Sequence, residues 1–107
     1  MRTLFLSTIV FVALAASSAS AANLGEHNYK PAEGFVPNAE TAIKIAVAVW
    51  VPIYGKENIE KQQPYTATLS NGVWYVQGSL PKDMAGGVAV AEISKLDGKI
   101  LRVSHGK

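Results

Sequence analysis

The sequence predicts an α+β domain in which one main helix packs on a four-stranded antiparallel sheet. Three blocks in a fixed order support this prediction. The apolar segment at 40–57 is typical of a helix, and the segments at 65–81 and 86–107 are typical of two hairpins. An antiparallel sheet commonly buries one face and leaves the other in water. We therefore expect the core to lie between the helix and the sheet.

The N-terminus has the pattern of a cleaved secretory signal. Arg2 gives a positive start, residues 4–16 form an apolar run, and small residues follow up to Ala21 and Ala22. We expect cleavage after Ala21 or Ala22, which would place the mature protein in the periplasm without a stable membrane anchor. A membrane anchor is the alternative, although the run is short for a bilayer.

These boundaries divide the chain into three predicted parts. They are a signal peptide at 1–21, an extended lead-in at 22–37 and a folded domain at 38–107. Removal of 21 of the 107 residues leaves 86, which is enough for one small domain. The chain has no cysteine, so stability must come from packing, alone or with a partner. Charge is nearly balanced and no basic stripe with interleaved aromatic residues occurs, which argues against nucleic acid as a partner.

The helix has clear signals at both ends. Asn38 is a good N-cap residue directly before the apolar segment. We expect the helix to reach about Val51, because Pro52 lacks a backbone donor. A kinked continuation to Tyr54 is the alternative, since Gly55 is suited to a left-handed helix end.

The predicted helix is apolar nearly all round. One face follows helical spacing and consists of Ala39, Ile43, Ala46, Val47, Trp50 and Tyr54. The opposite side carries Ile45, Ala48, Val49 and Val51. Such a helix needs cover on more than one side. Either the lead-in at 22–37 folds back over it, or a partner or a second copy in a homo-oligomer binds there.

The register of the first hairpin can be predicted from its turn. Asn71 and Gly72 between alternating apolar residues predict a two-residue type I′ loop. This loop sets Leu69 opposite Trp74, Thr68 opposite Tyr75, Ala67 opposite Val76 and Thr66 opposite Gln77. Cross-strand partners share a face. The turn and the hydrophobic alternation therefore select one register.

The second hairpin allows two loops. A two-residue loop at Asp97 and Gly98 would mix the faces. A three-residue loop that includes Leu96, with Gly98 left-handed, separates them and is preferred. It pairs Ile93 with Leu101, Ala91 with Val103, Ala89 with His105 and Glu92 with Arg102. The side of the sheet away from the helix would then hold Thr66, Thr68, Tyr75, Gln77, Val90, Glu92, Ile100 and Arg102.

Few residues carry recognisable chemistry. His27 and His105 lack metal-ligand spacing, and His105 is expected to be a strand-end side chain. Glu92 and Asp97 could form a carboxylate pair, but each has another predicted role. No nucleophile–base constellation occurs. We expect no catalysis, no metal and no cofactor, and we assign the aromatics Trp50, Tyr54 and Trp74 to the core rather than to a ligand pocket.

The three blocks resemble the small bacterial NTF2-fold immunity proteins of polymorphic toxin systems. The resemblance covers about residues 40–107 and lies in ETAIKIAVAVWVPIYGKE, NGVWYVQGSLP and the GG…EI…DGKI…SHGK ending. It implies a curved, cone-like sheet with the helix in its concavity, as in NTF2-like and cystatin-like folds. It also implies a non-catalytic role in which the protein binds and neutralises a cognate protein toxin.

An immunity protein would bind its toxin through an uncovered surface that presents aromatic or arginine residues. The open sheet face offers Tyr75 and Arg102, flanked by Gln77 and Glu92, so we predict this face as the binding surface. The apolar back of the helix is the alternative surface. The alternative function is that of a periplasmic PepSY-like or cystatin-like module that binds or inhibits another ligand.

Overall fold

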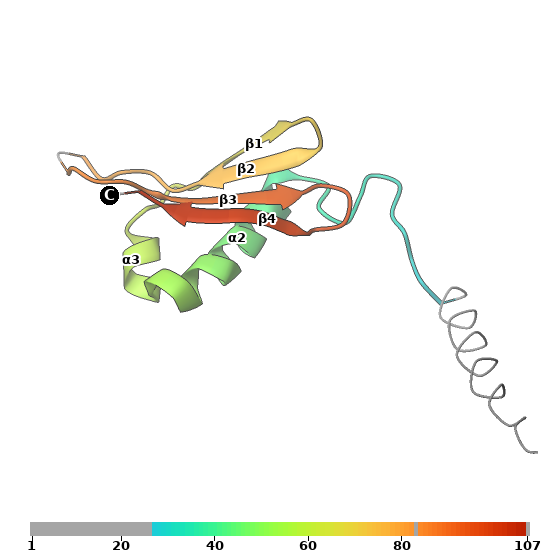
Figure 1. Cartoon of the computed structure of the whole chain (residues 1–107), viewed down its shortest axis with the longest axis horizontal. Helices are drawn as coiled ribbons and strands as arrows, with labels where there is room; N and C mark the ends of the chain where they lie inside the picture. The colour runs from blue at the N-terminus through green and yellow to red at the C-terminus, as the bar shows by residue number, and fades with distance from the viewer. Residues whose placement is uncertain (1–26, 83, 107) are drawn as a thin grey trace, which may run out of the picture. The chain divides into compact units, whose positions relative to one another are not determined.

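The computed structural model describes residues 27–82 and 84–106, and Pro31–Lys107 form one compact unit. The described elements are α2 (Ala39–Tyr54), α3 (Lys56–Glu60), β1 (Thr66–Ser70), β2 (Val73–Gln77), β3 (Ala89–Ser94) and β4 (Ile100–His105). The strands form one antiparallel sheet in the order β1-β2-β3-β4, and α2 packs on one of its faces (Figure 1). The predicted α+β architecture is confirmed. The predicted cleavage site lies outside the described residues.

Helix α2 begins after its predicted cap but ends beyond the expected Val51. The Asn38 side chain accepts a hydrogen bond from the Thr41 N–H at 2.9 Å, which caps the first turn. The helix continues through Pro52 to Tyr54, so the longer of the two alternatives is correct. Gly55 adopts a positive φ of 95°, which glycine allows without strain, and its N–H donates to the Val51 carbonyl.

The short helix α3 was not predicted. Its single apolar residue is Ile59, which gives no helical period, yet Ile59 is fully buried. The turn at Gly55 redirects the chain, and this change of direction brings Ile59 into the core. Tyr65 also helps to hold α3, because its hydroxyl donates to the Ile59 carbonyl at 2.9 Å.

The buried line of α2 is displaced from the predicted one. Ala42, Ala46 and Trp50 are fully buried at i, i+4 and i+8. Most of the residues predicted for this face flank the buried line and are half-buried: Ala39, Ile43, Val47 and Tyr54. The two alanines at the centre of the contact allow the helix to approach the sheet closely.

The backbone bonds that the described part of the lead-in makes with the sheet go to the β3–β4 turn. In its described part, the Phe35 and Val36 N–H groups donate to the Leu96 and Lys95 carbonyls, each at 3.0 Å. Val36 is fully buried, and its carbonyl accepts from Trp74 Nε1 at 2.8 Å. The segment therefore lies against the β3–β4 turn and supplies part of the core.

The first hairpin has the predicted register. Leu69 lies opposite Trp74, Thr68 opposite Tyr75, Ala67 opposite Val76 and Thr66 opposite Gln77. Asn71 and Gly72 have φ values of 50° and 77°, as a type I′ turn requires. Leu69 remains 43% exposed although it lies on the helix side, because β1 is an edge strand.

The second hairpin confirms most of its predicted pairs and corrects one. Ala89 lies opposite His105, Ala91 opposite Val103 and Glu92 opposite Arg102, but Ile93 lies opposite Ile100 rather than Leu101. The register shifts at Glu92 and Ile93, which marks a β-bulge. The Ser94 N–H donates to the Lys99 carbonyl, so the loop has four residues, 95–98, and not three. Gly98 has the expected positive φ, at 76°.

The longer loop has a physical cause in its neighbours. The Lys95 N–H donates to the Gly72 carbonyl, and the Lys95 carbonyl accepts from Val36. These bonds from two other segments hold Lys95 in the loop, and the bulge in β4 restores the register. As a consequence Ile100 pairs with the inward residue Ile93 and does not join the outer face as predicted.

The core lies between α2 and the sheet. Its fully buried members include Val36, Trp50, Ile59, Val76 and Ile93. Trp50 Nε1 donates to the Val90 carbonyl at 3.3 Å, so both tryptophans satisfy their polar atom inside the core. The assignment of Trp50 and Trp74 to the core is confirmed.

Candidate partner-binding surface

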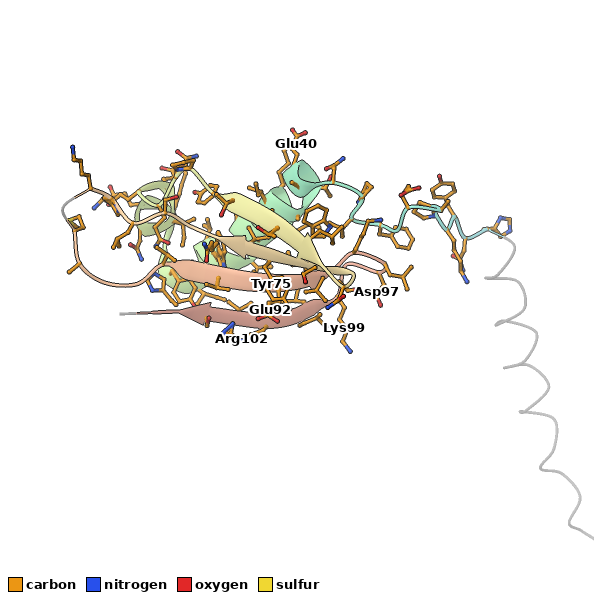
Figure 2. The ribbon with its side chains drawn as sticks, turned by 90° about the horizontal axis from the view of Figure 1, so that it is seen from above. Glu40, Tyr75, Glu92, Asp97, Lys99 and Arg102 are labelled. Carbon is orange, nitrogen blue, oxygen red and sulfur yellow. The ribbon has the colours of Figure 1, made fainter. Side chains whose placement is uncertain are left out.

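The outer face of the sheet, opposite α2, presents a row of side chains across three strands. Tyr75 lies opposite Glu92, and Glu92 lies opposite Arg102. Figure 2 shows these three residues one beside the next on β2, β3 and β4. Tyr75 is 42% exposed, and the Arg102 side chain is 54% exposed. The β2–β3 and β3–β4 registers therefore bring three of the four predicted binding residues together.

The fourth predicted residue, Gln77, lies on the same face one row away. It is exposed and stands opposite Thr66 and Val90. Because residues two apart on a strand point to the same side, Gln77 adjoins Tyr75 on the surface. We use the name outer face for this surface, whose members on the four strands are Thr66, Thr68, Ser70, Val73, Tyr75, Gln77, Val90, Glu92, Ser94, Arg102 and Ser104.

An ion pair orients the arginine of the outer face. Arg102 Nη1 donates to Glu92 Oε2 at 3.1 Å, with the Glu92 side chain 22% exposed. An exposed pair of this kind adds well under about 1 kcal/mol to stability. The ion pair holds the Arg102 guanidinium on the outer face, in the same row as Tyr75. The surface can thus offer an aromatic ring and a positioned cation to another protein.

The two carboxylates considered for acid–base chemistry have separate partners. Glu92 is bound to Arg102, whereas Asp97 belongs to the β3–β4 loop. The Lys99 N–H, which donates to Asp97 Oδ1 at 3.0 Å, holds the pKa of Asp97 below its usual value, with a further bond from Ser94. Asp97 therefore has a turn role, as predicted.

A second polar cluster occurs where α3 meets the sheet, and sequence reasoning did not find it. Gln62, only 5% exposed, accepts from the Ala89 N–H through Oε1 at 2.8 Å. Since that backbone donor fixes the amide orientation, Gln62 Nε2 must donate to His105 Nε2 at 3.0 Å. His105 Nδ1 then carries the proton and donates to the Gly106 carbonyl. Nothing in the local sequence distinguishes Gln62 from its neighbour Gln63.

This cluster supports the structural interpretation of His105. The Tyr54 ring lies with its centroid 4.9 Å from that of His105, and both ring nitrogens of the histidine have partners. A shallow hollow of about 230 Å³ adjoins the cluster, lined by Asn58, Lys61, Leu80, Pro81, Met84 and the chain at 85–87 and 105–106. His105 is a strand-end side chain, as predicted, held by Gln62.

A smaller apolar surface surrounds the β3–β4 loop. Phe35 is 53% exposed and Leu96 is 71% exposed, and the Phe35 N–H donates to the Leu96 carbonyl. A hollow of about 170 Å³ lies beside them, lined in part by Gly34, Gly72 and Lys95. Unlike the outer face, this surface is built from loops. We refer to it as the loop patch, defined by Phe35 and Leu96.

Two further properties concern the described part of the chain. Within residues 27–82 and 84–106, no three histidine or acidic side chains come together as metal ligands would. None of the helices in those same ranges has the length and apolar character needed to cross a membrane.

A comparison with known proteins finds a matching protein family. The model of a family described as NTF2 fold immunity protein matches residues 41–107. Two Escherichia coli K12 proteins are similar: the uncharacterized protein YhhH, 38% identical over 73 residues, and the uncharacterized protein YbbC, 40% identical over 55 residues. The first alignment covers 67% of this chain and 58% of YhhH, and the second covers 50% of this chain and 45% of YbbC. The chain thus spans about half the length of these relatives. No solved structure matches.

Proposed function

Since the chain belongs to the NTF2 fold immunity protein family, we propose that it is exported and neutralises a bacterial protein toxin by binding it, without catalysis. We further propose that the outer face makes the contact. The family supports the immunity role, and the N-terminal pattern supports export.

The observation that carries the outer-face proposal is the exposed Tyr75 in one row with Arg102, with Glu92 between them. Tyrosine and arginine are enriched among the residues that dominate binding energy at protein interfaces. Tyr75 lies on the inner strand β2 and is paired on both sides, so its backbone is held by neighbouring strands. A side chain on such a rigid support loses little conformational entropy on binding.

A double substitution tests the proposed surface. Tyr75→Ala with Arg102→Ala should leave cooperative unfolding intact, because both side chains are exposed. We expect the variant to lose binding to the product of a neighbouring toxin gene, measured by calorimetry. Cells that express it should also lose protection against that toxin. Removing two such residues weakens binding by about 2–4 kcal/mol or more, which is at least about 30-fold.

The loop patch provides a matched control. Phe35→Ala with Leu96→Ala removes comparable exposed apolar surface and should leave binding and protection unchanged. If the Tyr75 and Arg102 variant folds and still protects, the outer face is not the binding surface. If the gene's deletion never sensitises cells to a neighbouring toxin, the immunity role itself fails.

Export has its own measurement. The intact mass of protein from a periplasmic fraction should correspond to a chain beginning at Ala22 or Asn23. A full-length mass in the membrane fraction would instead support the anchored alternative.

A further inference from the structure

The two edge strands of the sheet are protected to different degrees. Edge strands present unpaired backbone groups, and natural proteins shield them with bulges, charges or proline. Strand β4 contains a bulge at Leu101, between Ile100 and the charged Arg102. Strand β1 at the other edge has the sequence Thr-Ala-Thr-Leu-Ser, with no charge, no proline and no bulge. Of its residues only Ala67 is half-buried, and the other four are exposed.

The turn of the first hairpin shows which groups of β1 point outward. A two-residue loop is closed by a hydrogen-bonded pair, here Ser70 with Val73. Hydrogen-bonded pairs alternate along the ladder, so Ser70, Thr68 and Thr66 direct their N–H and C=O groups toward β2. Ala67 and Leu69 direct theirs away from the sheet. Within the described ranges, no residue outside the sheet hydrogen-bonds to the backbone of Ala67 or Leu69.

The adjoining flank of α2 is apolar. The Tyr54 ring contacts His105 on β4, so its flank of the helix faces the β4 edge. At about 100° per residue, Ile45 lies nine residues and half a turn away from Tyr54, on the flank toward β1. Val49 follows one turn later, and both residues are half-buried. Together with Leu69, which is 43% exposed, they extend the apolar surface beside the β1 edge.

We propose that β1 pairs with β1 of a second copy of this chain, antiparallel and with the two-fold axis at Thr68. In this register the N–H and C=O groups of Ala67 bond to those of Leu69 in the second copy. The groups of Leu69 likewise bond to those of Ala67 in the second copy, which makes about four hydrogen bonds in all. The Leu69 side chain then packs on Ala67 of the other copy. The two Thr68 residues face each other at a non-hydrogen-bonded position, and the two sheets become one.

The strand itself identifies a second copy as the partner. A two-fold axis brings every residue against the image of one equally far from the centre. Hydroxyl residues occupy positions 66, 68 and 70, and apolar residues occupy 67 and 69. A two-fold axis at Thr68 therefore pairs hydroxyl residues with hydroxyl residues on one side of the sheet and apolar residues with apolar residues on the other. The strand carries no charge that would oppose its own image. At the β4 edge, the same operation about Leu101 or Arg102 would bring two arginines close together.

The oligomeric state tests the proposal independently of any toxin. Sedimentation of the processed wild-type protein over increasing concentration should show a dimer. Leu69→Lys places a charge at the proposed contact and should raise the dimer dissociation constant at least tenfold. Leu101→Lys is the matched control, because Leu101 is an edge-strand leucine 46% exposed on β4. It should leave the constant unchanged, and thermal melts should confirm that both variants fold.

A disulfide tests the register. The chain has no cysteine, so Thr68→Cys introduces the single thiol, placed on the two-fold axis where its image is within bridging distance. Oxidation should link the two copies. Thr66→Cys lies on the same strand and face, but roughly 14 Å from its own image, and should not link. A wild-type protein that stays monomeric, a dimer that survives Leu69→Lys, or equal linking of both cysteine variants would each overturn the proposal.

Discussion

Replacement of Gln62 should be unusually costly for a glutamine. Gln62→Met keeps most of the side-chain volume but offers no acceptor to the buried Ala89 N–H, now bound at 2.8 Å. A buried donor without a partner costs about 1–3 kcal/mol. The bond to His105 is also lost, at about 0.5–1.5 kcal/mol, and water can replace part of it because His105 is not fully buried. We expect a total loss of about 2–4 kcal/mol.

Urea denaturation and hydrogen exchange measure this effect together. The midpoint should fall without a change in the m-value, and the melting temperature should drop by about 10 °C or more in a domain of this size. The Ala89 amide should lose protection against exchange. Gln63→Met is the matched control, since Gln63 is exposed and should change stability by less than about 0.5 kcal/mol. A Gln62→Met protein within 0.5 kcal/mol of wild type would refute the assigned role of this side chain.

Two predictions concern the β3–β4 loop. Gly98→Val should lower the free energy of unfolding by about 1 kcal/mol or more, because valine resists the left-handed φ of 76° at this position. An added Cβ would lie 3.6 Å from the Val36 side chain, which is an ordinary contact, so the cost comes from the backbone conformation. Gly98→Asn should cost less in the same urea titration, and equal losses would contradict this reasoning. The lowered pKa of Asp97, caused first by the Lys99 N–H, means that its carboxylate stabilises the fold above about pH 4. That stabilisation is lost as the pH falls through the lowered pKa of Asp97 in the folded protein. The Asp97→Asn variant should therefore show a smaller decline of melting temperature between pH 5 and pH 2 than the wild type. An equal decline in the two proteins would contradict this role of Asp97.

The parts of the fold that sequence predicted are those set by local chemistry. The Asn38 cap, the Gly55 helix end and the type I′ turn at Asn71 each require particular residues, and each is present in the structure. In the first hairpin the turn and the hydrophobic alternation agree on one register. That agreement was enough to place Tyr75 on the outer face, whereas its position opposite Glu92 comes from the β2–β3 pairing, which was not predicted.

The parts that sequence missed depend on contacts between distant segments. The four-residue loop after Ser94 arises because Gly72 and Val36 both bind the backbone of Lys95. No periodicity within the second hairpin contains that information. Gln62 is similar: its partners Ala89 and His105 are 27 and 43 residues away. The outer face could be predicted except at Ile100, because strand alternation sets it wherever no bulge intervenes. The Gln62 cluster could not be predicted.

The blocks that carry the family resemblance meet at one end of the domain. The first block ends near Tyr54, whose ring contacts His105 of the terminal block. A Cβ added to Gly87 would lie 2.2 Å from the carbonyl carbon of Gly106, so the glycines at the start and end of the last block permit close backbone approach. These residues are therefore explained by packing.

The exposed members of the same blocks lack such an explanation. In the second block Trp74 is buried and hydrogen-bonded to Val36, whereas the next residue, Tyr75, shows no hydrogen bond of its hydroxyl within the described ranges. The Tyr75 ring is 42% exposed on an ordered inner strand, so folding leaves a large part of its apolar surface in water. Packing thus accounts for the scaffold residues, and the exposed part of the Tyr75 ring is the part available to the proposed partner. Tyr75→Thr should accordingly leave stability almost unchanged, since threonine also suits an exposed strand position. The same substitution should weaken toxin binding, and a marked loss of stability with binding intact would reverse this assignment.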